Sequence, residues 1–187
     1  MATGPLILEP GDLLAFWREA GPPAWFRKSD AFDAAIRERF EALHHAAARG
    51  ERDGWAGTAE GALALLLLLD QFPRNLYRGS AHAFVTHPLA RSVAERAIAA
   101  GHDLSMAADL RGFFYLPFEH SEDPADQARA VALCETLERE SGVSARWARE
   151  HRDIVARFGR FPHRNRCLGR RTMAAEQAFL DEGGFAG

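Results

Sequence analysis

Histidine, arginine and aromatic residues gather in the segment 151–166, which reads HRDIVARFGRFPHRNR. A guanidinium binds a carboxylate or phosphate through two parallel hydrogen bonds, and an imidazole can gain or lose a proton near neutral pH. Solvated loops seldom combine two phenylalanines with so many cationic groups. We therefore take this segment as a candidate anion site, with His151, Arg157, Arg160, His163, Arg164 and Asn165 as its binding residues.

The spacing of His151 predicts that its ring faces inward. It falls on one helical stripe with the apolar residues Val143, Trp147, Ile154 and Phe158. A buried imidazole needs a polar partner, and two interpretations stay open. The ring is either a core histidine bonded to a backbone carbonyl, or it is presented to a pocket beside the arginines.

The charge distribution favours a local anion site over a basic surface. The chain contains 23 Lys+Arg, of which only Lys28 is lysine, and its net charge is −3. Ten arginines and three acidic residues lie between Arg139 and Arg171, which gives that segment a charge of +7. Arginines interleaved with phenylalanine can contact single-stranded nucleic acid, but the overall negative charge argues against such a partner.

A second polar group follows the apolar run 62–69. An acid in the last turn of a helix is disfavoured by the helix dipole, so Asp70 should need an arginine partner. An ion-pair network at the helix end is one interpretation, and the polar wall of a pocket is the other. The candidate residues of this group are Asp70, Gln71, Arg74, Asn75 and Arg78.

A third group, His120 and Glu122, lies in an acidic stretch that ends at Asp126. Asp123 precedes Pro124, as expected for a helix N-terminus, so capping explains several of these acids. His120 among carboxylates can serve as an acid or a base. Two ligands in one loop are too few for a closed metal site, so we expect no metal and no cofactor.

Other classes of function are not supported by the sequence. No glycine-rich phosphate loop follows a strand, and Cys134 and Cys167 lack the spacing of a zinc or redox motif. The run 62–69 is too short to span a bilayer, and the first ten residues lack the pattern of a secretory signal. These features predict a cytoplasmic protein with no membrane contact.

Helices must position all three groups, because apolar residues recur with helical spacing and no stretch alternates as a strand does. Caps and proline or glycine stops predict seven or eight helices, near 11–20, 30–49, 58–71, 87–100, 109–116, 123–141, 144–158 and from 172 onward. The absence of a polar linker predicts one all-α domain over 1–187. A weak repeat of F-P-(x)-R-N, at 72–75 and 161–165, raises the possibility of two similar halves.

Three long motifs carry a resemblance to a known family. LLLLLDQFPRNLYRG, FFYLPFEHSEDPADQ and HRDIVARFGRFPHRNRCLGRRT, in that order, resemble the bacterial family catalogued as domain of unknown function 924. The opening LLAFWREAGPPAWFRKSDAFDAAIRERF is similar to its N-terminal part, although Arg18 stands where an aromatic is expected. The resemblance implies a right-handed α-α superhelix of tetratricopeptide-like type. It implies no activity, substrate or catalytic residue.

Three functions follow as hypotheses. The first is a binding protein that holds an acidic peptide or a small anionic ligand on a concave, Arg- and His-lined face. The second is a small hydrolase or transferase with His120 or His151 as general base, oriented by Asp70 or Glu122, and with arginines stabilising negative charge. The third is a purely structural role for the polar motifs. The oligomeric state is left open.

Overall fold

The computed structural model describes residues 8–187, and every regular element in this range is a helix. The predicted all-α class is therefore confirmed. None of the described helices is long and apolar enough to cross a membrane. The prediction that the first ten residues do not form a secretory signal falls, for residues 1–7, outside the described range.

The chain divides into two compact units, Met1–Arg78 with His82–Phe114, and Gly79–Ala81 with Tyr115–Gly187. We call them unit 1 and unit 2 and describe each by itself. The predictions of one domain over 1–187 and of a tetratricopeptide-like superhelix stay predictions.

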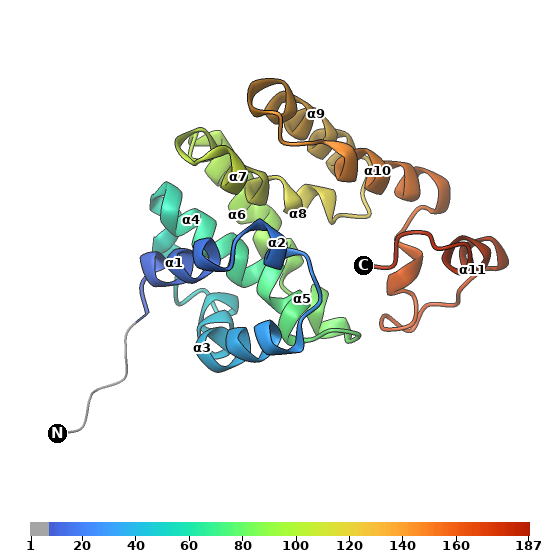
Figure 1. The fold of residues 1–187 in the computed structure, drawn as a ribbon, viewed down its shortest axis with the longest axis horizontal. Helices are drawn as coiled ribbons and strands as arrows, with labels where there is room; N and C mark the ends of the chain where they lie inside the picture. The colour runs from blue at the N-terminus through green and yellow to red at the C-terminus, as the bar shows by residue number, and fades with distance from the viewer. Residues whose placement is uncertain (1–7) are drawn as a thin grey trace. The chain divides into compact units, whose positions relative to one another are not determined.

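Unit 1 is built around α4, whose residues are almost all buried. Its helices are α1 (Pro10–Ala20), α2 (Pro22–Trp25), α3 (Asp30–Ala48), α4 (Ala59–Leu66), α5 (Phe72–Leu76), α6 (His87–Ala99) and α7 (Ala108–Arg111) (Figure 1). Helices α1 and α6 both pack on α4, and α3 packs on α5. Trp17 of α1 is fully buried, and its ring lies 5.6 Å from that of Phe72. Burial of such large rings supplies much of the stability of a helical core.

Side-chain caps start the helices where the sequence predicted them. The hydroxyl of Ser29 accepts from the N–H of Phe32, and that of Thr58 accepts from the N–H of Gly61. In unit 2 the carboxylate of Asp123 accepts from the N–H of Ala125. Each cap satisfies an amide that has no partner inside its own helix.

The predicted helix end near residue 71 is wrong. The chain continues from α4 through a π-helical turn, Leu67–Gln71, directly into α5. A π turn widens the helix and frees carbonyls from the regular ladder. The carbonyl of Leu68 faces Nδ1 of His44 at 2.8 Å, and that of Leu69 accepts from the hydroxyl of Thr86. These two side chains stabilise the turn that carries Asp70.

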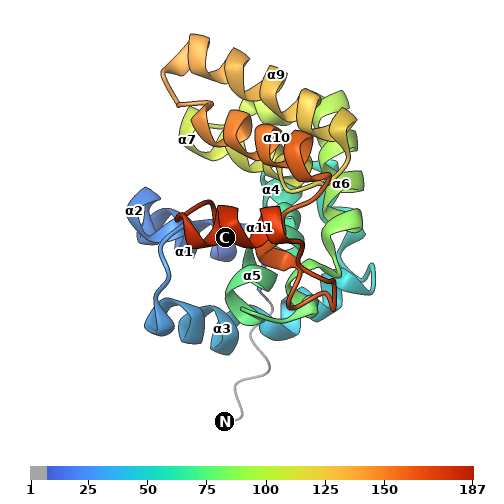
Figure 2. The ribbon, with the colours of Figure 1, turned by 90° about the vertical axis from the view of Figure 1, so that its right-hand side faces the viewer.

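Unit 2 consists of α8 (Leu116–Glu119), α9 (Pro124–Ser141), α10 (Arg146–Phe158) and α11 (Ala174–Asp181). Helices α9 and α10 lie side by side (Figures 1 and 2). Gly159 ends α10 with φ +70°, a left-handed conformation that favours glycine. A 3₁₀ turn, Pro162–Arg164, follows, and α11 starts two residues later than the predicted Thr172.

Candidate functional site

The second polar group of the sequence, which follows the apolar run 62–69, lies in unit 1 on the π turn and α5. Asp70 is almost completely buried, and its carboxylate accepts from Nε2 of Gln71 at 2.8 Å and from Arg74 at 3.3 Å. The predicted Asp70–Arg74 pair is present. Its stated cause is wrong, because Asp70 sits within a continuous helical path rather than in a last turn.

Asn75 and Arg78 of the same group bind a residue that the sequence reasoning missed, Asp33 of α3. Nδ2 of Asn75 donates to Asp33 at 2.7 Å, and the guanidinium of Arg78 donates to both carboxylate oxygens. Burial alone would raise the pKa of Asp33, but the bonds from Arg78 and Asn75 outweigh it and lower the pKa. Asp33 gave no signal of this role, since an acid in a first helical turn is explained by the helix dipole.

Glu122 in unit 2 joins two distant segments. Its carboxylate accepts from both terminal nitrogens of Arg170, at 2.9 and 2.8 Å, and from the backbone N–H of Phe161. Burial opposes ionisation, yet these donors hold the pKa of Glu122 below its usual value. Glu122 is therefore bound to Arg170 and Phe161. It does not orient a histidine, which was one of the two roles that the enzymatic hypothesis offered to Asp70 or Glu122.

Arg160 and Asn165 bind a second missed acid, Glu176 of α11. Arg160 donates to both oxygens of Glu176, at 2.6 and 2.9 Å, and Nδ2 of Asn165 donates at 3.1 Å. The N–H of Met173 adds a further bond. Chiefly through Arg160, these donors lower the pKa of Glu176 to about 2.

The two copies of F-P-(x)-R-N make the same kind of contact, each within its own unit. In each, the asparagine (Asn75 or Asn165) donates to a buried carboxylate that is also held by an arginine. The arrangement ties a turn to a helix of the same unit, and it uses Arg78 and Arg160 internally. This observation favours a structural role for these four side chains.

His163 and Arg164 lie against the ring of Phe161 in unit 2, and Arg164 also reaches the backbone of His120. Nη1 of Arg164 donates to the carbonyl of His120 at 2.9 Å, and the guanidinium carbon lies 4.2 Å from the centre of the Phe161 ring. The His163 ring lies 5.7 Å from that of Phe161. The structure therefore brings His120 and the 161–165 turn together, as parts of one aromatic and cationic cluster.

His151 is buried, as its position on the apolar stripe predicted, and only 5% of its surface is exposed. Its Nδ1 lies 2.8 Å from Oε1 of Glu119, a partner that the sequence reasoning did not name. Glu119 is equally buried, so α8 and α10 face each other through a buried carboxylate–imidazole contact. The prediction that the whole stripe faces inward is wrong for two of its residues, because Trp147 is 50% exposed and Val143 38% exposed.

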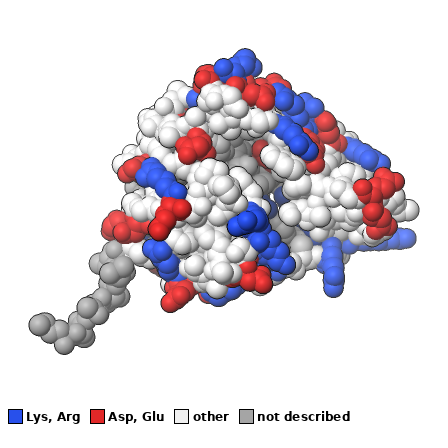
Figure 3. Space-filling view, viewed as in Figure 1, with Lys and Arg blue, Asp and Glu red and all other residues white. Residues whose placement is uncertain are grey.

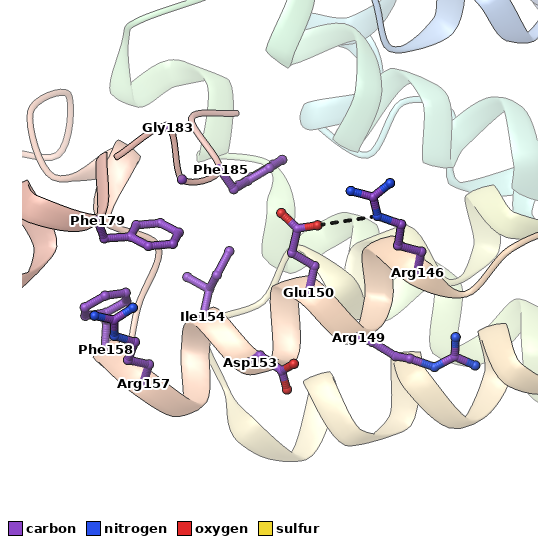
Figure 4. A pocket seen from close by; sticks show the side chains of 11 residues that line it. Arg146, Arg149, Glu150, Asp153, Ile154, Arg157, Phe158, Phe179, Gly183 and Phe185 are labelled. Carbon is purple, nitrogen blue, oxygen red and sulfur yellow. Dashed lines mark ion pairs between the residues drawn. The ribbon is translucent and has the colours of Figure 1, made fainter. Parts of the chain in front are cut away.

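A pocket of about 480 Å³ lies between α10, α11 and the residues after α11. Its lining comprises Arg146, Arg149, Glu150, Asp153, Ile154, Arg157, Phe158, Phe179, Gly183, Gly184 and Phe185 (Figure 4). Ile154 and Glu150 extend from α10 toward Phe185, while Arg149 and Asp153 point away from that side. The size is typical of small-molecule sites.

The charged groups of this pocket differ in what they already bind. Arg146 lies 3.9 Å from Glu150, and Arg149 donates to Glu135 and Glu138 of α9. Arg157 lies over the rings of Phe158 and Phe179, at 4.7 and 5.8 Å, and has no carboxylate partner within residues 8–187. Of the predicted site residues, Arg157 alone lines the pocket.

The face of the molecule seen in Figure 3 is not predominantly basic. On the side seen in Figure 3, acidic and basic side chains alternate over the described residues. Pairing with acids that are remote in sequence neutralises much of the local +7. No group of three or more His, Cys, Asp or Glu side chains in the described range could hold a metal.

The Cys134 thiol should be nearly inert in the folded chain. Burial, with a smaller contribution from Glu119, raises its pKa to about 12, and the thiolate is the reactive form. We expect alkylation by iodoacetamide at pH 8 to be at least about tenfold slower in the folded than in the unfolded protein. Peptide mass spectrometry measures this residue by residue, and equal rates in the two states would contradict the expectation.

Three comparisons place the chain among known proteins. Residues 13–184 match the family described as "Bacterial protein of unknown function (DUF924)". The chain is similar to a solved structure of a protein of unknown function, ATU0120 from Agrobacterium tumefaciens. The two share 54% sequence identity and a TM-score of 0.89, over 93% of this chain and 97% of that one. No curated protein matches the chain.

Proposed function

Because this chain belongs to the DUF924 family of bacterial proteins of unknown function, its role must be argued from its own residues, and we propose that it binds a small anionic ligand with an apolar body. The site is the pocket between α10 and α11. The observation that carries the proposal is Arg157, a guanidinium on the wall of a partly aromatic pocket with no carboxylate partner in residues 8–187.

The chemistry of the walls selects the class of ligand. Phe158, Phe179 and Ile154 offer apolar surface, and removing a ligand's apolar surface from water drives binding. Arg157 is exposed and its guanidinium lies over two rings, where it can pair with a carboxylate or phosphate through two hydrogen bonds. A ligand with an anionic group at one end and a hydrocarbon or aromatic body at the other fits both Arg157 and the apolar walls.

This proposal narrows the first sequence hypothesis. Arg78 and Arg160 already hold Asp33 and Glu176, so they have fewer donors to offer an external anion. A pocket of about 480 Å³ suits a small molecule more than a long acidic peptide.

We expect 3-phenylpropionate to bind the wild-type chain and the R157Q variant to bind it at least about tenfold more weakly, since a charge-assisted pair is lost. Calorimetric titration gives the affinity, and NMR shifts of Ile154, Phe158 and Phe179 locate the ligand.

The matched control is R139Q on the neighbouring helix α9, which removes an exposed arginine that bonds Thr136 and does not line the pocket. It should leave the affinity unchanged. The uncharged analogue 3-phenylpropanamide should bind the wild-type chain as weakly as 3-phenylpropionate binds R157Q. If the amide binds as well as the acid, or if R157Q binds normally, the proposed function is wrong.

A further inference from the structure

Both ring nitrogens of His151 are buried, and neither makes a hydrogen bond of regular geometry within residues 8–187. Nδ1 still lies 2.8 Å from Oε1 of Glu119, whereas Nε2 has no polar partner of any kind in that range. An unsatisfied buried polar atom costs stability, because it has lost water without gaining a replacement. Such an atom is expected where a ligand supplies the missing bond.

The ring of Phe185 covers His151. The two ring centres are 4.5 Å apart in an edge-to-face arrangement. His163, Trp147 and Phe161 surround the same phenyl ring at 5.1, 6.1 and 6.5 Å. Four aromatic side chains thus form a box around one flat ring, and this ring carries no polar atom.

Phe185 belongs to a segment outside the helices. It follows Gly183, which has φ +81°, and Gly184, and residues 184–187 form no regular structure. The side chain is only partly buried, and it also lines the pocket described above. Moving Phe185 aside would therefore join the aromatic box to the pocket of Arg157.

The position of Glu119 beside Nδ1 indicates what kind of group the missing partner must be. The carboxylate of Glu119 beside Nδ1 favours the tautomer with its proton on Nδ1, which leaves Nε2 as an acceptor. The partner at Nε2 must then donate a hydrogen bond. A phenolic hydroxyl can donate this hydrogen bond, and it sits on the edge of a flat ring as large as the phenyl ring of Phe185.

We infer that Phe185 occupies the place of a ligand ring, and that the ligand is a phenolic carboxylic acid. Its hydroxyl donates to Nε2 of His151, its ring replaces that of Phe185, and its carboxylate pairs with Arg157. The assignment of the ligand carboxylate to Arg157 rests on the proposed function. The assignment of the phenol rests on the aromatic box and on Nε2 of His151.

The test compares 3-(4-hydroxyphenyl)propionate with 3-phenylpropionate by calorimetry. We expect the hydroxylated acid to bind the wild-type chain about tenfold more tightly, the factor that one net hydrogen bond provides. In F185A both acids should bind more tightly, because the ring that competes with them is gone. In the double variant F185A/H151F the preference for the hydroxyl should disappear.

Neutral probes separate the two proposals. If 4-ethylphenol binds F185A more tightly than ethylbenzene does, while R157Q has no effect on any acid, the phenol site stands and the proposed function fails. If the acids depend on Arg157 but the hydroxyl gives no preference, the phenol site is refuted and the proposed function stands.

A spectroscopic readout covers the case in which H151F does not fold. In F185A the ¹⁵N resonance of His151 Nε2 should shift on addition of 4-ethylphenol and stay in place with ethylbenzene. An Nε2 resonance that ignores 4-ethylphenol at saturation would overturn the inference.

Discussion

Replacing Glu176 by glutamine lowers the free energy of unfolding of unit 2 by about 2 kcal/mol, the size expected when hydrogen bonds to a charged group are lost. Glu176 is 3% exposed and is the common acceptor of Arg160, Asn165 and the N–H of Met173. The neutral amide can accept one of these bonds but leaves the arginine without its countercharge. Hydrogen exchange of peptides covering 160–181 measures the loss where it occurs.

The same carboxylate should make unit 2 sensitive to acid. Its pKa is about 2 in the folded chain, against an ordinary value of 4.5. A depressed pKa means that the stabilisation is complete above the unfolded value and is lost as the pH falls from about 4.5 toward 2. The E176Q variant should lack this part of the pH dependence.

Glu182 supplies the matched control for this prediction. It lies just after α11, is exposed, and makes none of the contacts of Glu176. The E182Q variant should change the stability by less than about 0.5 kcal/mol, as surface substitutions usually do. Equal effects of E176Q and E182Q on stability would show that the bonds from Arg160, Asn165 and Met173 to Glu176 do not stabilise unit 2.

The helices could be predicted from the sequence because their signals are local. Ser29, Thr58 and Asp123 cap helices in the structure, and Gly159 ends one, as their positions predicted. Such signals act over one turn and need no knowledge of the fold. The π turn gave no such signal, since residues 61–71 are buried all round and lack a polar face from which to count a period.

The partners of the arginines could not be predicted, because they are set by packing. Asp33 and Arg78 are remote in sequence, and Glu176 reaches Arg160 only because α11 folds back on the 161–165 turn. In sequence both acids are explained equally well as first-turn residues that favour the helix dipole. Sequence reasoning therefore predicted the cationic residues of the candidate site and missed the carboxylates that occupy two of them.

The internal carboxylates also decide which cationic residues are candidates for an anion site. A cluster of arginines in sequence says little about an anion site until the internal carboxylates are known. Arg157 qualifies because its contacts are two aromatic rings rather than an acid. His151 qualifies because burial, which the apolar stripe did predict, leaves Nε2 without a partner in the described chain.

Asp33 offers the corresponding prediction in unit 1. The D33N variant should lose about 2 kcal/mol of stability, the range expected for hydrogen bonds to a charged group. The amide that replaces the carboxylate would oppose two donors, Asn75 and Arg78, with one carbonyl oxygen and a second donor of its own. Thermal unfolding with hydrogen exchange of peptides covering 30–78 measures the effect.

The stability difference between D33N and the wild-type chain should depend on pH. The pKa of Asp33 is lowered in the folded chain, so its contribution is present above its unfolded pKa and is lost as the pH falls through the folded value. The D33N variant should therefore differ most from the wild-type chain at neutral pH and approach it in acid. D30N, at an exposed acid in the same helical turn, should cost well under about 1 kcal/mol, because only a helix-dipole contribution is lost. A D33N variant that is no less stable than D30N at pH 7 would show that Asp33 does not hold α3 to α5.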